Sequence, residues 1–182
     1  MIRSFFNVKV PLFRRVLLVE SGSRDLFEGL IPGIYSNHKD VVIDLFTCYG
    51  GQPKTLREDA RIFRVIDYGG GSAGRARLLA EVSAKGYDVL GIICSAEPIM
   101  TKWKWWFTWK LPGAKAFVLN ENGDYFWIDR AHKHILSHFL FYRLGLTGAG
   151  TPAALARLLF FPLSALGLVL YACLAHLRRL RA

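Results

Sequence analysis

The chain has 182 residues and a mass of 20.6 kDa, enough for one domain and an appendage, which excludes most large two-domain enzymes. Apolar residues make up 52% of the sequence and aromatic residues 14%, so a sizeable core can form and general disorder is not expected. Lysine and arginine outnumber aspartate and glutamate by 24 to 14, and the mean hydropathy is +0.25. Positive charge combined with high hydropathy indicates a membrane-associated protein.

The charge is unevenly placed along the chain. All 14 acidic residues precede position 156, whereas 156–182 contain four arginines and no acid. A pI of about 9.8 is typical of nucleic-acid binders, but no helix-turn-helix, zinc-finger or RNA-recognition signature accompanies it. We therefore expect no nucleic-acid partner. The three cysteines are odd in number and widely spaced, which argues against a disulfide framework or a zinc site.

Short apolar, β-branched runs alternate with helical or turn stretches, which is typical of an α/β sheet. Strands are expected at 16–20, 41–47, 62–68, 89–95 and 115–120. Helices are expected at 25–30, 74–85, 99–111 and 129–144. The predicted fold class is α/β, a single Rossmann-like and largely parallel sheet of about five strands with flanking helices, followed by a C-terminal hydrophobic membrane helix.

The last part of the chain carries the signal for that membrane helix. Residues 158–175 contain no charge, are apolar on every helix face and are long enough to cross a bilayer. The predicted domains are an α/β domain at 1–144, a glycine-rich linker at 145–155 and a membrane helix with a basic tail at 156–182. Pro162 leaves open whether the helix spans or is re-entrant. The expected location is a bacterial-type inner membrane, with the main domain on the cytoplasmic face.

A second membrane feature is predicted in the sequence IMTKWKWWFTWKL at 99–111. Tryptophan rings favour the lipid headgroup layer, and lysine side chains reach anionic lipid. The residues assigned to this membrane surface are Trp103, Trp105, Trp106, Trp109, Lys102 and Lys110. Core packing of the same rings against a sheet stays open as the alternative, although interleaved lysines are awkward inside a core.

Ligands of parallel sheets collect at the carboxyl ends of the strands, where loops meet helix N-termini. The polar residues of this sequence gather there. The candidate substrate-binding or anion-binding residues are Ser21, Gly22, Ser23, Arg24, Gly69, Gly71, Gly74, Arg75, Asn120 and Glu121. Asp67, Glu97, Glu121 and Asp124 are candidate general bases. Each of these residues also has an ordinary interpretation as a cap, a turn former or an ion-pair partner.

The sequence GGGSAG at 69–74 matches G-x-G-x-x-G and is followed by arginines. Three interpretations stay open, a flexible turn, an anion site and a dinucleotide site. The last is disfavoured because the motif follows the third predicted strand instead of the first. His134 and His138 have metal-chelating spacing, but no third ligand can be named. We predict no cofactor and no metal.

The stretch VLLVESGSRDLFEGLIPGI, followed by VVIDLFT, resembles the opening of GT-B glycosyltransferases of the heptosyltransferase type. GYDVLGIICS is similar to the central strand of that family. The resemblance covers roughly 15–121 and implies the N-terminal, acceptor-binding half, without the half that binds the nucleotide sugar. It implies a role as base for Asp25, although Ser23-Arg24-Asp25 replaces the usual Gly-Asp pair. It also implies that a partner chain supplies the missing half.

Together these features predict a membrane-attached, glycosyltransferase-like protein of cell-envelope glycoconjugate biosynthesis. It would bind a phosphorylated or lipid-linked saccharide at the strand ends. The expected partners are membrane lipid, a lipid-linked or nucleotide saccharide, and a partner protein. A non-catalytic membrane adaptor stays open as the alternative, as does a disfavoured nucleotide-binding oxidoreductase, and the sequence does not decide whether the chain is an enzyme.

Overall fold

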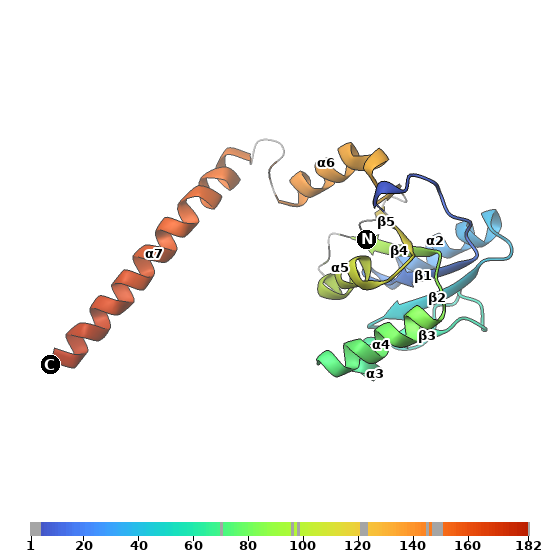
Figure 1. Cartoon of the computed structure of the whole chain (residues 1–182), viewed down its shortest axis with the longest axis horizontal. Coiled ribbons are helices and arrows are strands. Elements are labelled where there is room, and N and C mark those ends of the chain that lie inside the picture. The colour runs from blue at the N-terminus through green and yellow to red at the C-terminus, as the bar shows by residue number, and fades with distance from the viewer. Residues whose placement is uncertain are drawn as a thin grey trace. The chain divides into compact units, whose positions relative to one another are not determined.

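The structure is a computed structural model that describes residues 5–69, 71–95, 97, 99–120, 124–144, 146 and 151–181. They belong to two compact units, Met1–Lys133 and His134–Ala182, which we call unit 1 and unit 2. Unit 1 contains the sheet. Unit 2 contains most of helix α6 (Lys133–Arg143) and all of helix α7 (Thr151–Arg181). Figure 1 labels the elements of both units.

Unit 1 is built on a six-stranded sheet in the order β3-β2-β1-β4-β5-β6. The strands are β1 (Arg15–Val19), β2 (Val42–Thr47), β3 (Ile62–Arg64), β4 (Val89–Cys94), β5 (Lys115–Asn120) and β6 (Tyr125–Trp127). Strands β1 to β5 pair in parallel, and β6 pairs antiparallel with β5. The fold is therefore α/β with a mixed sheet, and its strand order is that of doubly wound nucleotide-binding folds.

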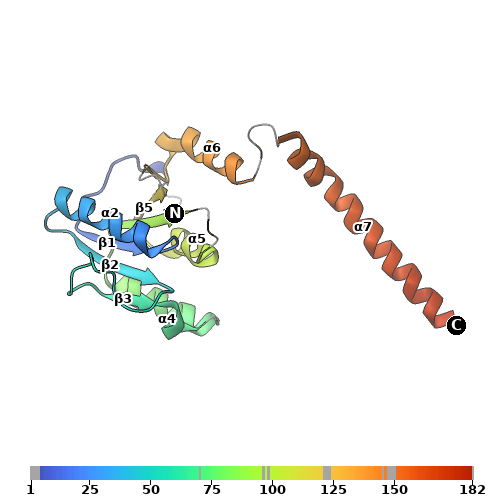
Figure 2. The same ribbon diagram turned by 180° about the vertical axis from the view of Figure 1, so that it is seen from behind.

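Three helices cover the two faces of this sheet. They are α2 (Arg24–Asn37), α4 (Ser72–Ala84) and α5 (Thr101–Lys110). Phe27 and Ile31 of α2 pack against Val16 of β1 on one face. On the other face Phe46 of β2 contacts Phe107 of α5, with ring centroids 4.8 Å apart. Because side chains alternate along a strand, each central strand contributes to both cores, and Figure 2 shows α2 and α4 on opposite sides of the sheet.

Two predicted elements end at different residues in the structure. The strand expected at 62–68 stops at Arg64, and Val65–Tyr68 forms the short helix α3. Strand β3 pairs with the end of β2, where Thr47 faces Arg64, so no paired strand lies beyond that point. The helix expected at 25–30 continues through Pro32 to Asn37, because Ile31 in its second half is fully buried in the core.

The structure contradicts the predicted membrane helix. Residues 151–181 form helix α7, but among the described residues no helix combines the length and apolar character that crossing a bilayer requires. A span needs about 20 consecutive apolar residues. Of the predicted linker at 145–155, residues 145 and 147–150 lie outside the described residues, whereas 151–155 form the start of α7.

Candidate functional site

The carboxyl ends of the parallel strands form one edge of the sheet. The chain runs from β1 to β2 and β3 on one side, and later places β4 and β5 on the other side of β1. Such a switch point separates the loops that leave the two central strands, and ligands of open α/β sheets bind there. The loops after β1 and β4 are therefore the expected location of a binding site.

A buried carboxylate lies at the end of β1. Glu20 is fully buried, and its Oε1 accepts a hydrogen bond from Arg24 Nε at 2.5 Å. Its Oε2 accepts hydrogen bonds from Arg24 Nη2 at 3.1 Å and from Thr47 Oγ1 at 2.5 Å. The bidentate pair with Arg24 compensates the charge of the buried carboxylate. Arg24, expected to bind an anionic ligand, is thus held by an acid of the protein itself.

The loop after β1 is packed directly against β4. A Cβ atom on Gly22 would lie 3.0 Å from Cγ2 of Ile93 and 3.3 Å from Oγ of Ser95. The Ser21 hydroxyl donates a hydrogen bond to the Ile93 carbonyl, and Ser21 is fully buried. Ser23 caps helix α2, because its Oγ accepts a hydrogen bond from the backbone N–H of Leu26 at 3.4 Å. These three predicted ligand-binding residues shape the loop.

The glycine motif divides into residues with different roles. A Cβ atom on Gly74 would lie 1.5 Å from the carbonyl oxygen of Tyr68, so α3 and α4 approach this closely only with glycine there. Gly69 ends α3 with a φ of 62°, in the left-handed region. Gly71 is the N-cap of α4, and a Cβ atom there would meet nothing within 4 Å. Backbone conformation therefore explains Gly69, and close packing explains Gly74.

A pocket lies between the first turns of α4 and α5. Its volume is about 280 Å³, and Arg75, Lys102, Trp103 and Trp106 line it. The Arg75 guanidinium carbon is 5.5 Å from the centroid of the Trp103 ring, a cation–π arrangement. The rings of Trp103 and Trp106 meet edge to face, with centroids 5.5 Å apart. We call these four residues the basic tryptophan pocket.

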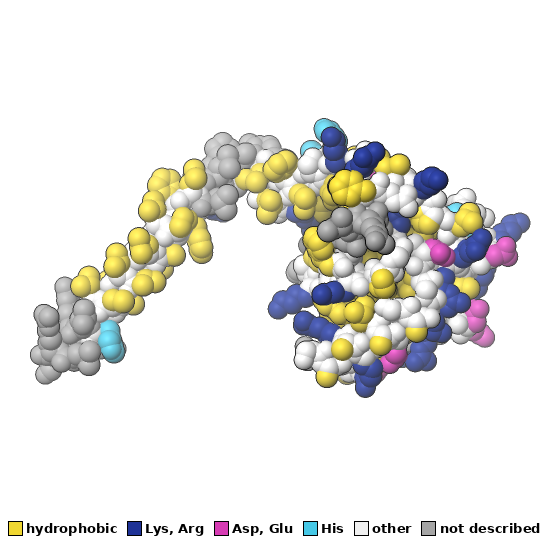
Figure 3. All heavy atoms as spheres, in the orientation of Figure 1, with side chains coloured by type: hydrophobic (Ala, Val, Ile, Leu, Met, Phe, Trp, Pro, Cys, Tyr) yellow, Lys and Arg dark blue, Asp and Glu magenta, His cyan; other side chains and the backbone are white. Residues whose placement is uncertain are grey.

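The electrostatics of this pocket favour an anion. Helices α4 and α5 have no acidic residue in the first turn and no hydrogen-bonded side-chain cap. Their N-terminal backbone N–H groups carry partial positive charge, which adds to the charges of Arg75 and Lys102. Helix α2 differs, since it has Ser23 as a cap and Asp25 in its first turn. Lys and Arg also predominate over acidic side chains on the face of unit 1 in Figure 3.

The basic tryptophan pocket adjoins the end of β2. The Trp103 ring packs against Phe46, with centroids 5.3 Å apart. Phe46 directly precedes Thr47, which donates a hydrogen bond to Glu20. The pocket and the buried Glu20 pair therefore border the same carboxyl edge of the sheet.

The predicted membrane surface on α5 is divided between two environments. Trp103 and Trp106 are half-buried and line the pocket, whereas Trp109 is 62% exposed. Trp105 is half-buried, and Lys102 and Lys110 are exposed. The interleaved Lys104 is buried on the face that also carries Phe107. The tryptophans thus combine packing with exposure instead of forming one uniform surface.

The three predicted catalytic acids lie apart among the described contacts. Asp25 is exposed in the first turn of α2. Asp67 is exposed in α3, where its carbonyl accepts a hydrogen bond from Arg77 Nη2. Glu97 is exposed near Tyr49. Burial raises the pKa of the Tyr49 phenol, and the charges of Cys48, Glu20 and Glu97 add to that effect.

The remaining predicted residues follow β5. The side chain of Asn120 exchanges hydrogen bonds with Asp124, donating to Oδ2 at 3.2 Å and accepting from the backbone N–H at 2.8 Å. These bonds close the β5–β6 hairpin. Glu121 lies outside the described residues. Among the described residues no group of three or more histidine, cysteine or acidic side chains is placed to hold a metal ion.

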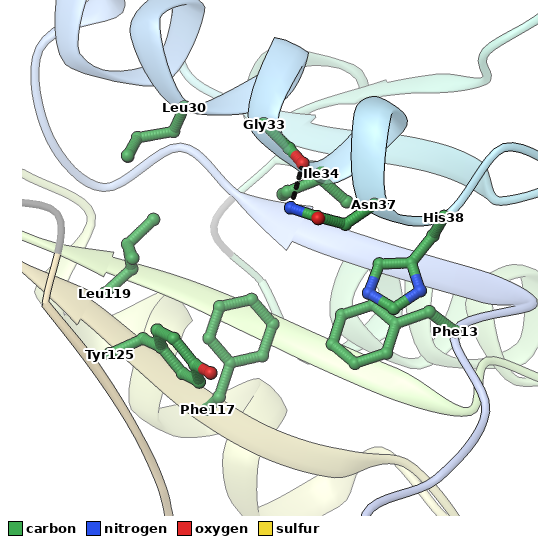
Figure 4. A pocket seen from close by; sticks show the side chains of 9 residues that line it. All are labelled: Phe13, Leu30, Gly33, Ile34, Asn37, His38, Phe117, Leu119 and Tyr125. Carbon is green, nitrogen blue, oxygen red and sulfur yellow. Dashed lines mark hydrogen bonds between the residues drawn. The ribbon is translucent and has the colours of Figure 1, made fainter.

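Sequence reasoning missed a second cavity, on the α2 face of the sheet. Figure 4 shows α2 residues on one side of it, facing β5, β6 and Phe13 across the opening. Its volume is about 660 Å³, and its lining residues are Phe13, Leu30, Gly33, Ile34, Asn37, His38, Phe117, Leu119 and Tyr125. The Phe13 ring stacks on His38 with centroids 4.3 Å apart. We call this cavity the α2 groove. Gly33 of α2 lies in its lining, and a glycine between the apolar residues of this helix is the sequence feature that could have indicated the cavity.

No family model, curated protein or solved structure matches this chain. The likeness to glycosyltransferases of the heptosyltransferase type therefore rests on the sequence segments that suggested it.

Proposed function

We propose that this protein binds a phosphorylated saccharide at the carboxyl edge of its sheet and acts in the assembly of cell-envelope glycoconjugates. The observation that carries the proposal is the basic tryptophan pocket. Arg75 and Lys102 come from different helices and meet at this edge, and neither helix has an acid in its first turn. Arginine and lysine are the side chains that most often bind phosphate oxygens in proteins.

The tryptophans support the saccharide part of the proposal. An indole ring offers a rigid apolar face together with one hydrogen-bond donor, a combination suited to a ligand with both C–H and hydroxyl groups. Trp103 and Trp106 offer such faces beside the two cations. Small-molecule sites combine aromatic walls with a few polar groups in the same way.

Sugar transfer would require a donor-binding half in addition to unit 1. Unit 1 is a single doubly wound sheet, and the family resemblance implies that a separate half binds the nucleotide-sugar donor. We propose that a partner chain supplies that half. Asp25 and Glu97 are the candidate general bases of this assembly, because both acids are exposed beside loops at the carboxyl edge.

The α2 groove favours a second candidate function, the non-catalytic adaptor. An adaptor recruits its partner through contacts alone. The floor of the groove is formed by the buried apolar residues Phe117 and Leu119. A partner segment seated there would complete the cover of this face of the sheet.

A thermal-shift panel tests the leading candidate. A ligand that binds only the folded state raises the melting temperature, and its stabilising free energy grows with the logarithm of one plus its concentration divided by its dissociation constant. We expect hexose phosphates to raise the melting temperature of the full chain and the unphosphorylated hexoses to leave it unchanged. If no phosphorylated saccharide shifts the transition, the saccharide proposal fails and the adaptor is favoured.

A further inference from the structure

We infer that the basic tryptophan pocket binds the phosphomonoester of a single sugar ring, with the phosphate between Arg75 and Lys102 and the ring against Trp103 and Trp106. This inference rests on the proposed function and narrows its ligand. It separates a sugar phosphate from a nucleotide sugar, a phosphodiester and free phosphate.

The size of the pocket limits the ligand. Its volume of about 280 Å³ is just below the roughly 300–1,000 Å³ typical of small-molecule sites. One sugar ring and its phosphate suit such a space. A nucleotide sugar, which adds a base, a second ring and a second phosphate, would extend well outside it.

The cations of the pocket are available to a ligand. Arg24 and Lys115 of unit 1 are already paired, with Glu20 at 2.5 Å and with Asp129 at 2.7 Å. Among the described residues, Arg75 and Lys102 form no ion pair with an acidic side chain. Both side chains are exposed at the pocket. Two cations without an acidic partner among the described residues, in one small pocket, favour an anionic ligand.

The charge of the pocket favours a monoester over a diester. A phosphomonoester carries about −1.5 to −2 charges at pH 7, whereas a diester carries a single negative charge. Arg75 and Lys102 supply two positive charges, and the uncapped N-termini of α4 and α5 add partial positive charge beside them. The two negative charges of a phosphomonoester would therefore be balanced by the two cations of the pocket.

The arrangement of Arg75 prepares the site for its ligand. The guanidinium lies over the Trp103 ring, which restricts its movement before any ligand arrives. Trp103 is in turn fixed by its contact with the buried Phe46. A phosphate bound by Arg75 alters the charge next to the indole ring, so ligand binding should change tryptophan fluorescence.

The experiment titrates glucose 1-phosphate into the full chain, with tryptophan fluorescence and calorimetry as readouts. Arg75→Gln and Lys102→Gln each remove one charge at an exposed position. We expect each substitution to weaken binding by about tenfold to a hundredfold, the usual effect of losing a hydrogen bond to a charged group. Trp103→Leu should weaken the binding of glucose 1-phosphate while leaving that of inorganic phosphate nearly unchanged.

Matched controls are available on the same two helices. Arg77→Gln removes a charge from α4, and Lys110→Gln and Trp109→Leu change exposed residues of α5. None of these three residues lines the pocket. Each control variant should bind glucose 1-phosphate within about twofold of the unsubstituted chain, since exposed substitutions away from a site have small effects. Circular dichroism identifies any variant that fails to fold. If Trp103→Leu fails to fold, Lys102→Gln still tests the inference, because Lys102 is exposed.

The outcomes separate the inference from the proposed function. If the unsubstituted chain binds no phosphorylated saccharide, the proposed function fails. If it binds glucose 1-phosphate and the pocket variants bind equally well, the proposed function stands and the inference is overturned. Binding of UDP-glucose, methyl glucose phosphodiester or inorganic phosphate as tight as that of glucose 1-phosphate would also overturn the inference.

Discussion

Tyr87 and Asp44 form a buried hydrogen-bonded pair that links the two sides of β1. The Tyr87 hydroxyl donates to Asp44 Oδ2 at 2.6 Å, and Asp44 Oδ1 accepts from the backbone N–H of Arg61 at 2.8 Å. Asp44 belongs to β2, and Tyr87 lies just before β4, the two strands that flank β1. Burial, the hydrogen bond to Asp44 and its negative charge raise the pKa of the Tyr87 phenol.

Removing this hydroxyl should destabilise the fold. Tyr87→Phe leaves Asp44 Oδ2 buried without its donor, and an unsatisfied buried group costs about 1–3 kcal/mol. We expect the free energy of unfolding in urea to fall by that amount. Tyr125→Phe is the control, because the Tyr125 side chain is exposed. Equal urea midpoints for the two variants would show that the buried bond contributes nothing.

The acid sensitivity of unit 1 should depend on Asp129. Its carboxylate is 2.7 Å from both Lys115 Nζ and His132 Nδ1. Burial opposes ionisation, but the hydrogen bonds from Lys115 and His132 outweigh it and hold the pKa of Asp129 below its usual 3.8. Stabilisation by the ionised form is therefore complete well above pH 3.8 and is lost as the pH falls through the lower pKa of the folded state.

Asp129→Asn tests this dependence. We expect it to lower the free energy of unfolding at neutral pH by about 3–5 kcal/mol, because Lys115 loses its buried partner. The same substitution should flatten the decline in stability below pH 4, measured by urea unfolding over a pH series. An unchanged acid slope in Asp129→Asn would assign the acid sensitivity to other carboxylates.

The glycines of the GGGSAG motif should respond differently to alanine. Gly74→Ala places a methyl group 1.5 Å from the Tyr68 carbonyl oxygen, so α3 and α4 must separate. We expect a loss of about 1–3 kcal/mol or more, as for other overpacked sites. Gly71→Ala, where the methyl group meets nothing within 4 Å, is the matched control. Thermal melts of the two variants give the comparison, and a smaller loss for Gly74→Ala would contradict the packing role.

The α2 groove can be filled from Gly33. A side chain there starts in open space on the wall of the cavity, whereas Gly29 has equal space outside it. Gly33→Leu and Gly29→Leu should each gain roughly 0.5–1 kcal/mol of helix stability. Only Gly33→Leu should reduce the fluorescence of an apolar dye bound to the chain. Equal dye binding in both variants would place the apolar dye site elsewhere.

Hydrophobic patterning predicted most of the fold. Each of the five expected strand ranges overlaps a strand of the sheet, because buried parallel strands leave continuous apolar runs in the sequence. The limits of β3 depended on its partner, since its pairing stops where β2 ends at Thr47. Strand β6, which is not among the five expected strands, has three residues and is defined by its antiparallel pairing with β5.

The site could be predicted only residue by residue. Arg75 was assigned to an anion and Trp103 to a membrane, because their meeting depends on α4 and α5 starting side by side. The burial of Glu20 was not visible in the sequence either, so its neighbour Arg24 was assigned to a ligand. Whether a charge is available or already paired depends on tertiary contacts, and sequence spacing alone does not contain that information.

The central position of β1 has a consequence for biosynthesis. Val16–Val19 pair with residues of β4 that leave the ribosome long after β1, β2 and β3 have been made. Until then one edge of β1 presents unpaired backbone groups to its surroundings. Closing such a distant contact slows folding and prolongs the aggregation-prone stage of the nascent chain. The nascent chain should therefore expose an unpaired strand edge for longer than a chain whose central strand pairs only with its neighbours in sequence.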